Sequence, residues 1–407
     1  MCALLASSAS SARSARASWP TLDVVWRASR ERAPESVEAL SETLRARSEG
    51  VGARTSSFDN PILHFNADHG VGATPLGASN GLVATGLLGL PIEIAGQRSA
   101  RIRSVDALVS WRERQQATAE GRAGGAAIGA YGRAVVARAR VEQASRAEEQ
   151  AEDELTWFEA RTQVGDATAV DRSLAQTELA RQAQFRAEAE IDLVEAQADL
   201  RALTGLPDIG DPPADAASGS PPGIGPAARQ AEQALGATPR VEAYEREQAY
   251  WSREVERARG LRWSPLEVMV TGGQDEFGQV RVGGGLGWSL PIVRRGEGEI
   301  ARATAAMDRA RADREAVSRA IEAVVRGLDE QLARTGVAVV DLDRTGIPAA
   351  ERLVQATDAA FRAGKLELVR VLNARRDLAL MRGRRLDLVE GGWRAYGDLA
   401  AILGVLP

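Results

Sequence analysis

The sequence is poor in the residues that build catalytic and metal centres. Of its 407 residues one is a cysteine, Cys2, and two are histidines. A single cysteine excludes an internal disulfide framework and a thiolate metal site. No serine or cysteine lies at a spacing from a histidine that favours nucleophilic catalysis. These absences predict a protein that is not an enzyme and that holds no cofactor or metal ion.

Long apolar runs and basic runs are also missing. No stretch of 18 or more apolar residues occurs, which predicts no transmembrane helix and leaves a water-soluble protein or a membrane β-barrel. The net charge is −5, Lys365 is the only lysine, and no basic run is interleaved with aromatic residues, so nucleic-acid binding is not predicted. Aromatic residues make up 4% of the chain, whereas alanine, arginine and glutamate dominate, a balance typical of long packed helices.

The two histidines, His64 and His69, lie close to Asp68 in a stretch that alternates between apolar and polar residues. In a strand, His64 and Asp68 would share one face and His69 would point away. This arrangement favours a polar lining of a sheet over a metal site.

A repeat of about 200 residues organises the chain. The segment 160–180 aligns with the segment 360–380, so that Gly165 matches Gly364, and Pro91-Ile92 recurs as Pro291-Ile292. Each glycine interrupts a long helical pattern that then resumes, as at the tip of a helical hairpin. The recurrence predicts two tandem repeats, each with a short helix, two strands and a long helical hairpin.

The repeat gives the expected boundaries. The parts are a truncated signal or targeting remnant at 1–19, the first repeat at 20–204, an irregular linker at 205–239 and the second repeat at 240–407. The first helix is expected at about 22–48, and the strands at about 62–69, 81–92, 265–272 and 280–291. The hairpins are expected at about 97–204 and 296–404, with tips at 165 and 364. Cys2 is either a lipidated mature terminus or an ordinary signal residue.

The last predicted strand shows the alternation most clearly. Val280, Val282, Leu286 and Trp288 alternate with glycines, Arg281 and a serine. Such a pattern, with an aromatic residue near one end, is typical of outer-membrane strands, and a half-buried strand of a soluble sheet would show the same alternation. Four strands cannot close a membrane barrel, whereas three copies of the chain would supply twelve.

The helices are unusually long. The pattern after Gly96 runs to about residue 163, which corresponds to a rod of about 100 Å at 1.5 Å per residue. Five glycines between residues 121 and 132 allow close helix approach and also lower helix propensity. Pro348 removes a backbone donor and should kink or break the corresponding rod of the second repeat.

Several motifs resemble one family. The strand ending in LPI before a long arginine-rich helix, and the tips QVGDATAVD and RAGKLELVRVL, are similar to those of the outer membrane efflux protein family, also called TolC-like. NPILHF and LPIEIAGQRSARI resemble its heavy-metal efflux branch. The resemblance covers about residues 20 to 407.

The resemblance implies a fold and a set of partners. The fold is mainly α with a small membrane β-barrel contribution: a homotrimer with an α-barrel of helical rods and a twelve-stranded β-barrel. The implied place is the outer membrane of a Gram-negative bacterium, with outer-membrane lipid around the barrel and a large periplasmic part. The implied function is a passive exit duct, with heavy-metal cations as candidate cargo, fed by a periplasmic adaptor and an inner-membrane pump of the RND type.

Two other classes of protein also contain coiled coils. A periplasmic adaptor would have one hairpin flanked by compact β domains, and a cytoplasmic coiled-coil scaffold would have no reason for strands such as 280–290.

The resemblance also implies docking residues. The tips of the family meet the adaptor, and the matching positions are Val164, Gly165 and Asp166 in the first repeat and Ala363, Gly364 and Lys365 in the second. The two glycines are either required for the chain reversal, because a left-handed conformation is cheap only for glycine, or are simple helix terminators.

A gate is predicted beside the tips. Family members with an acidic constriction carry Asp-Val-Leu-Asp, where this chain has Arg370-Val371-Leu372-Asn373. Asp171 is the counterpart of Arg370 in the first repeat. We expect Asp171 and Arg370 to alternate in a ring, with Asn373 in place of the second acid, that holds the resting channel closed without a strong preference for cations. Alternatively, Arg370 points outward into solvent.

Overall fold

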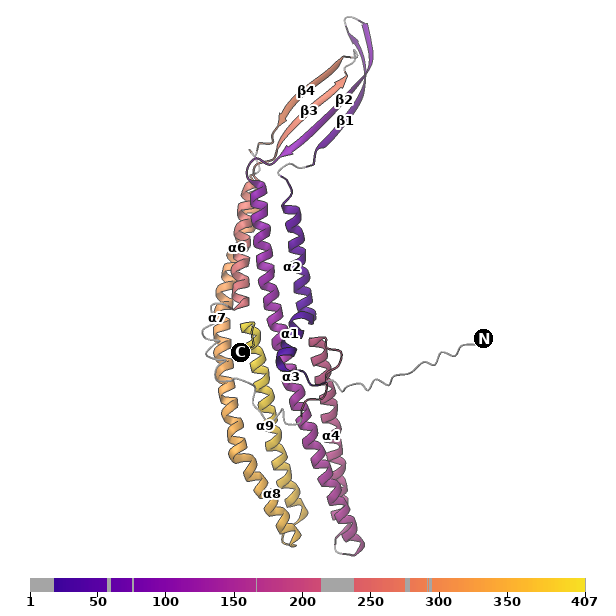
Figure 1. Cartoon of the computed structure of the whole chain (residues 1–407), viewed down its shortest axis with the longest axis vertical. Helices are drawn as coiled ribbons and strands as arrows, with labels where there is room; N and C mark the ends of the chain where they lie inside the picture. The colour runs from indigo at the N-terminus through magenta and orange to yellow at the C-terminus, as the bar shows by residue number, and fades with distance from the viewer. Residues whose placement is uncertain are drawn as a thin grey trace, which may run out of the picture. The chain divides into compact units, whose positions relative to one another are not determined.

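The computed structural model describes residues 18–56, 60–74, 77–165, 167–213, 238–274, 279–290, 292 and 295–406. The chain forms two compact units, and Figure 1 labels the helices and strands from which they are built. One unit comprises Met1–Glu38, Ala117–Pro239 and Arg319–Pro407, and the other comprises Ala39–Gln116 and Arg240–Ser318. Each unit is built from both sequence repeats, and each is described by itself below.

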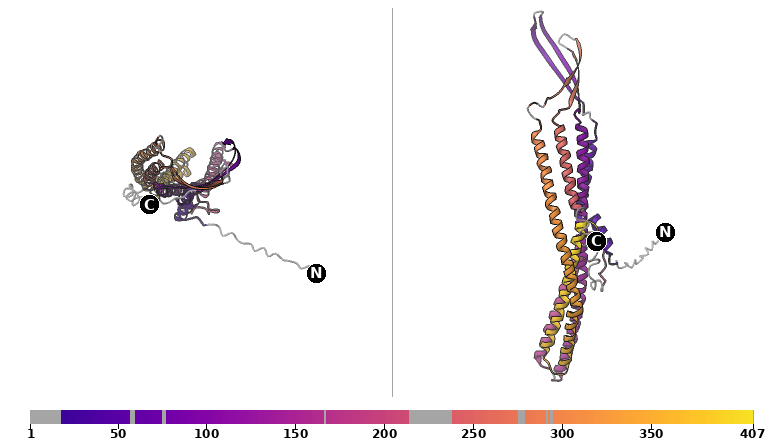
Figure 2. Two further views of the ribbon diagram at one scale, coloured as in Figure 1. Left: turned by 90° about the horizontal axis from the view of Figure 1, so that it is seen from above. Right: turned by 90° about the vertical axis from the view of Figure 1, so that its left-hand side faces the viewer.

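The second unit contains the sheet. Strands β1 (Ile62–Thr74), β2 (Gly77–Ile92), β3 (Leu266–Gln274) and β4 (Val280–Gly287) pair antiparallel in the order β1-β2-β3-β4. The sheet bends into an arc when it is seen end-on (Figure 2, left). Each repeat contributes one β-hairpin, β1-β2 or β3-β4, and the two β-hairpins pair with each other through β2 and β3.

The strand boundaries differ from the prediction at two places. The first hairpin is longer than expected, because the small residues predicted as a turn continue the ladder from Gly70 opposite Gly81 to Thr74 opposite Gly77. Strand β4 ends at Gly287 rather than near residue 291. Its ladder stops opposite Glu267 because β3 starts just after Pro265, which has no N–H to donate.

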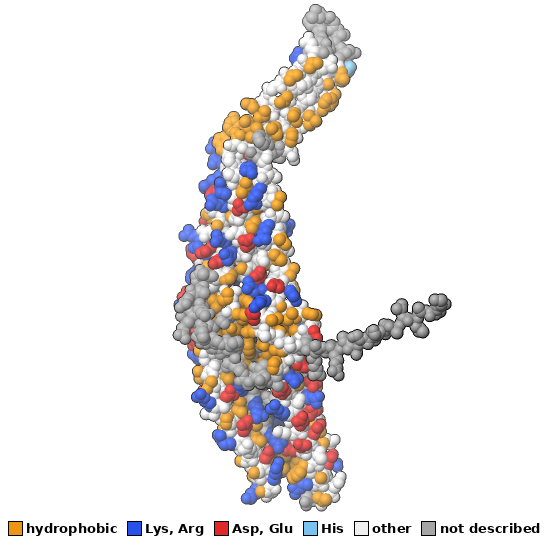
Figure 3. Space-filling view, in the orientation of Figure 1, with side chains coloured by type: hydrophobic (Ala, Val, Ile, Leu, Met, Phe, Trp, Pro, Cys, Tyr) orange, Lys and Arg blue, Asp and Glu red, His pale blue; other side chains and the backbone are white. Residues whose placement is uncertain are grey.

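The register sorts the side chains onto two faces. Cross-strand partners share a face, and Leu63 lies opposite Leu88, which lies opposite Val270. Apolar side chains of this face are exposed in all four strands, among them Leu63, Phe65, Leu82, Leu88, Val270, Val282 and Leu286. Figure 3 shows hydrophobic side chains spread over the sheet. His64, Asn66 and Asp68 lie on the opposite face, as the alternation predicts.

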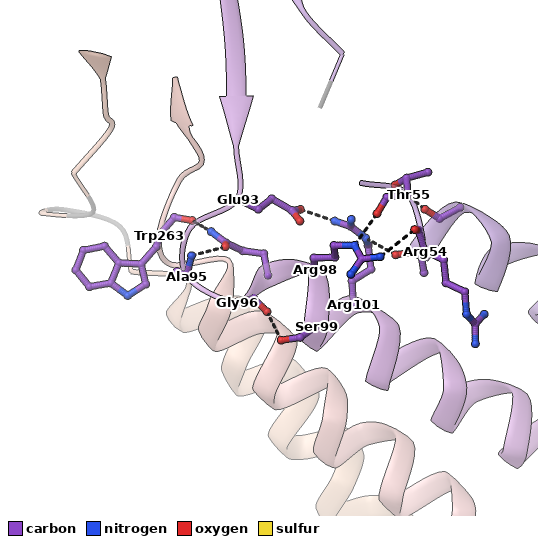
Figure 4. Close-up of polar contacts among 12 residues, drawn as sticks. Arg54, Thr55, Glu93, Ala95, Gly96, Arg98, Ser99, Arg101 and Trp263 are labelled. Carbon is purple, nitrogen blue, oxygen red and sulfur yellow. Dashed lines mark hydrogen bonds and ion pairs between the residues drawn. The ribbon is translucent and has the colours of Figure 1, made fainter. Parts of the chain in front are cut away.

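Helices of both repeats support the sheet in this unit. They are α2 (Pro34–Ala53), α6 (Pro239–Gly260) and the adjoining parts of α3 (Gln97–Gln163) and α7 (Glu297–Asp341). At the start of α3, Arg101 donates a hydrogen bond to the carbonyl of Ala53, the last residue of α2, and Arg98 donates to the carbonyls of Arg54 and Thr55 just after it (Figure 4). Cationic side chains at a helix C-terminus satisfy carbonyls that have no intrahelical partner.

The predicted first helix is in fact two helices. Helix α1 (Leu22–Arg32) ends before Ala33, and α2 begins at Pro34. Proline is tolerated in the first turn of a helix, where its missing N–H has no intrahelical partner, but it is not tolerated in the interior. Pro34 therefore divides the segment that the apolar pattern alone presented as continuous.

The other unit contains the helical hairpins. Helix α3 pairs with α4 (Ala169–Thr204), and α7 continues through a short π-helix, η3 (Leu342–Gly346), into α8 (Ile347–Arg362), which pairs with α9 (Leu368–Leu403). Figure 2 (right) shows α8 and α9 side by side down to their connecting turn. Helix α3 is continuous over 67 residues, as predicted.

Glycines let α3 and α9 approach closely. A Cβ atom on Gly125 would lie 2.3 Å from the carbonyl oxygen of Gly397, and one on Gly132 would lie 2.2 Å from the Cβ of Trp393. Real side chains do not tolerate such distances, so these positions require glycine for packing. The close approach predicted from the small residues of 121–132 is confirmed.

Pro348 interrupts the second hairpin, as predicted. Regular α-helix stops at Asp341, and α8 starts with Pro348 in its first turn. The N–H of Ile347 bonds the carbonyl of Leu342 in the wider π pattern. The π-helix lies where the proline ring would otherwise clash with the carbonyl four residues earlier.

Among the residues that the structure describes, six glycines have positive φ angles, and they form three pairs about 200 residues apart: Gly96 with Gly296, Gly165 with Gly364, and Gly205 with Gly404. Each pair stands at the same kind of junction in the two repeats. The predicted linker is irregular from Gly205 to Pro213, where Ile209 is buried against Val25 and Leu200. Residues 214–237 lie outside the described residues.

Candidate functional site at the hairpin ends

The first tip is built around Gly165. Helix α3 ends at Gln163, Gly165 adopts φ = +83°, and its N–H bonds the carbonyl of Thr162. Helix α4 then begins after its N-cap Thr168. The Val164 side chain is exposed, and Asp166 lies outside the described residues. The tip thus presents an apolar side chain at the predicted docking position.

The second tip has a defined turn geometry. The N–H of Gly364 bonds the carbonyl of Phe361 at 2.8 Å, and the N–H of Lys365 bonds that of Ala360 at 2.9 Å. This pair of bonds is the Schellman arrangement, which places a left-handed residue after the helix, here Gly364 with φ = +70°. No atom lies within 4 Å of a Cβ built on either tip glycine. A side chain would therefore be resisted by the backbone conformation and not by crowding.

The predicted gate residues lie near the starts of α4 and α9, with Asp171 and Arg370 in the first turns and Asn373 in the second turn of α9. The carboxylate of Asp171 accepts hydrogen bonds from the N–H and the hydroxyl of Thr168, at 3.1 and 2.7 Å, in a capping box. Arg370 and Asn373 are exposed on α9. Asp171 and Arg370 are each the third residue of their helix, as the repeat predicts. Within one chain, Asp171 is engaged in starting α4, and the guanidinium of Arg370 extends into solvent.

An apolar cluster joins the two hairpins just above their tips. Its buried members come from three helices, and we call them the tip cluster: Phe158, Ala175, Leu368 and Leu372. Phe361 of α8 packs against it, with its ring centroid 6.0 Å from that of Phe158. The ends of both hairpins therefore share one small core.

Arg375 of α9 completes this junction with charge. Its guanidinium pairs with Glu154 of α3 at 2.7 Å and with Asp358 of α8 at 3.0 Å. The three side chains are 26%, 17% and 27% exposed, respectively. Burial raises the pKa of Glu154 above its ordinary value, Arg375 opposes that rise, and Asp358 and Glu178 add to it. Arg375 is thus an ionic tie between the two hairpins close to their tips, and Arg140 of α3 forms another farther along α9 with Asp387 and Glu390.

The spacing of residues along α9 already distinguishes Arg375 as a charged residue with partners, although its role was not predicted from the sequence. Leu368, Leu372 and Arg375 follow the four-three spacing of one helix face, so that an arginine stands where the apolar stripe continues. A charged residue on a buried stripe requires partners.

A second ionic contact holds the π-helix. Arg385 of α9 pairs with Asp343 of η3 through two bonds, at 2.6 and 3.1 Å. Bidentate guanidinium–carboxylate pairs fix geometry as well as charge. These two bonds therefore hold η3 against α9.

The predicted polar lining of the sheet contains no cluster of metal ligands among the described residues. His64 and Asp68 are exposed on one face of β1, and no group of three or more possible metal ligands occurs in the described part of the chain. In the same part of the chain, no helix is both long and apolar enough to cross a membrane.

The chain is similar to known efflux proteins. No family model matches it. It is 28% identical over 331 residues to the cobalt-zinc-cadmium resistance protein CzcC of Cupriavidus metallidurans, covering 79% of this chain and 77% of that protein. Its fold matches the transmembrane channel protein CusC with a TM-score of 0.73 at 14% identity, over 94% of this chain and 92% of that one. In sequence and in fold, the chain resembles the heavy-metal branch of the TolC-like outer membrane efflux protein family.

Two further structures share the fold of this chain. The outer-membrane channel OprN matches with a TM-score of 0.72 at 19% identity, over 95% of this chain and 90% of that one. The outer membrane protein VceC of Vibrio cholerae matches with a TM-score of 0.70 at 17% identity, over 95% and 97% of the two chains. The predicted family and the mainly helical fold with a small antiparallel sheet are confirmed. The proteins that the chain resembles are named as a metal-resistance protein, an outer membrane protein and an outer-membrane channel.

Proposed function

We propose that this chain is the homotrimeric exit duct of a tripartite efflux pump. Three chains would form a twelve-stranded β-barrel in outer-membrane lipid and a tunnel of helical rods in the periplasm. A periplasmic adaptor and an inner-membrane pump of the RND type would feed it. Heavy-metal cations are the proposed cargo, because the relative CzcC is named for cobalt, zinc and cadmium resistance.

The observation that carries this proposal is the exposed apolar face of an open four-stranded sheet. The outer edges of β1 and β4 have no partner strand within the described sheet. Unpaired strand edges are costly in lipid, because nothing there can bond their N–H and C=O groups. Pairing β4 of one copy with β1 of the next would satisfy both edges.

A comparison of α2 with α6 supports the same assembly. Helix α6 contacts two long helices: Tyr250 stacks on Trp111 of α3 at 5.4 Å, and Glu245 pairs with Arg314 of α7. Helix α2, its counterpart in the first repeat, contacts α3 and leaves an apolar stripe exposed, formed by Leu40, Leu44 and Val51. The repeat therefore supports the packing of α7 from a second copy against this stripe.

Membrane fractionation tests the duct. The full-length protein, expressed in a Gram-negative host, should sediment with the outer membrane, require detergent for extraction and cross-link as a trimer. Recovery from the aqueous fraction without detergent would refute the duct and return the question to a coiled-coil scaffold.

The cargo has a separate test. In a host that lacks only the outer-membrane component of its metal efflux system, the protein should restore growth in cobalt, zinc or cadmium. Unchanged sensitivity to all three metals would remove heavy-metal cations as cargo while leaving the duct intact.

The hairpin ends are proposed to dock and to gate. The exposed tips would meet the adaptor, and Asp171, Arg370 and Asn373 would line the closed mouth of the trimer. In planar bilayers, Arg370→Asp should raise conductance and shift selectivity toward cations, because it replaces a cation with an anion at the mouth. Unchanged conductance and selectivity would place Arg370 in solvent, outside the gate.

A further inference from the structure

Two tryptophans form an exposed stack at one end of the sheet. Trp263 precedes β3 and Trp288 follows β4, and their rings lie 5.5 Å apart with an interplanar angle of 18°. Their side chains are 44% and 43% exposed. Stacked aromatic rings are normally covered by protein, because each ring carries a large apolar area. This pair leaves almost half of that area uncovered.

The backbone beneath the stack is fixed. The hydroxyl of Ser264 donates to the carbonyl of Ser289 at 3.0 Å, which joins the two connecting segments. The carbonyl of Trp263 accepts a bond of 2.8 Å from the buried side chain of Gln97 (Figure 4). The rings are therefore held in place although one side of the pair is open.

The surroundings of the stack are apolar toward the sheet and cationic toward the helices. Leu261, Leu290 and Ile292 are exposed beside it. Trp288 continues the alternation of Val282 and Leu286, so it lies in step with the apolar face of the sheet. The exposed residues Arg262 and Arg295 flank the same junction. Figure 3 shows the change from hydrophobic to charged side chains at the end of the sheet nearest the helices.

The first repeat lacks this arrangement. By the repeat alignment that pairs Pro91 with Pro291, the position of Trp288 corresponds to Leu88. The aromatic pair thus belongs to the second hairpin of the sheet alone.

We propose that the Trp263–Trp288 stack binds the phospholipid headgroup layer and fixes the depth of the sheet in the membrane. The rings would lie at the boundary between acyl chains and headgroups, where a side chain with an apolar body and an N–H donor is most favourable. Arg262 and Arg295 would reach the lipid phosphates while their stems follow the apolar surface. This inference rests on the proposed membrane duct and adds the residues that set its level.

Depth-dependent quenching tests the stack. The full-length protein is reconstituted into phosphatidylethanolamine–phosphatidylglycerol vesicles that carry bromine either near the headgroup or near the acyl-chain end. Tryptophan fluorescence is compared between the wild type and Trp263→Phe/Trp288→Phe. The control is Trp157→Phe, which removes a partly exposed tryptophan of the other unit. Flotation of the vesicles shows separately whether each variant is inserted.

The expected result is strong quenching by headgroup-proximal bromine, reduced at least about twofold in the double variant and unchanged in the control. Equal quenching in the double variant and the wild type, or stronger quenching by bromine at the chain end, would overturn the anchor while the duct stands. If the wild type does not float with the vesicles, the membrane duct itself fails, and the anchor with it.

Discussion

The two helical hairpins occupy corresponding positions in the two repeats but differ in the continuity of their helices. The first descends as one α-helix of 67 residues, whereas the second is broken by the π-helix at Leu342–Gly346 and by Pro348. Interior π-segments and prolines leave defects in the hydrogen-bond ladder, and helices bend at such defects. The comparison indicates that duplication preserved the turns of the hairpins and that one copy then acquired a place to bend.

The difference matters because the hairpins are tied together below that point. Arg375 and the tip cluster connect α9 to α3, so a bend of the second hairpin must act against these contacts. In the proposed gate, a closed state held by this tie and an open state without it would form a two-state equilibrium, which ligands or mutations shift only by stabilising one state more than the other. Four predictions follow from this comparison, in order of decreasing effect.

The largest effect should come from the tips that both hairpins share. Gly165→Val together with Gly364→Val should abolish efflux and leave trimers in the membrane, since valine is strained at positive φ. The matched control is Gly327→Val with Gly336→Val, two glycines with no positive φ and no atom within 4 Å of an added Cβ. Efflux at the wild-type level in the tip variant would show that the glycines only terminate helices.

Arg375→Ala should loosen the tie between the hairpins. Each of its two partly exposed ion pairs is worth about 1 kcal/mol at most, so the loss of both, about 2 kcal/mol, should raise the ratio of open to closed channels, measured from the single-channel open probability, by up to about thirtyfold. Arg384→Ala is the control, because that side chain is 81% exposed. If both variants behave as the wild type, Arg375 serves packing alone.

Removing the π-helix η3 and Pro348 should lower the open probability, by less than Arg375→Ala raises it. A five-residue π-helix contains about one residue more than the α-helical phase requires, so deletion of exposed Arg344 together with Pro348→Ala should make the second hairpin as continuous as the first. We expect a lower open probability and a higher thermal midpoint. Pro348→Ala alone is the comparison that keeps the extra residue. An unchanged open probability would mean that the channel opens without bending at η3.

The smallest effect concerns pH. Because the pKa of Glu154 is raised in the folded protein, its contribution to stability is complete below the unfolded carboxyl value and is lost as pH rises through the raised value. In the proposed gate, protonation therefore favours the closed state that keeps Glu154 buried beside Arg375, so open probability should fall modestly as pH falls. Asp358 and Glu178 face the same site and stay in place in Glu154→Gln, which should lose this dependence. A wild-type response retained in that variant would assign the titration to another group.

The sequence predicted the features that depend on local spacing. The recurrence of Gly165 as Gly364 located both tips, and the alternation from Val280 to Leu286 placed the apolar face of the sheet. It did not predict the ladder from Gly70 to Thr74, because small residues favour a turn as much as a strand. It also did not predict the division at Ala33, because the apolar pattern continues across Pro34.

The junction at Arg375 was missed for a different reason. Its partners, Glu154 and Asp358, lie on other helices, and no spacing along one helix specifies which helices meet. An arginine on an apolar stripe indicates that an acidic partner is present but does not identify which residue it is. The structure was needed to identify both carboxylates.

The interrupted hairpin has a consequence for the symmetry of the proposed trimer. Six hairpins would surround the mouth, and stiff and bendable ones would alternate. If only the three interrupted hairpins swing outward, the aperture passes from a nearly sixfold outline to a triangular one. Half of the wall then stays fixed as a frame, and the widest cargo is decided by the distance between three stationary rods.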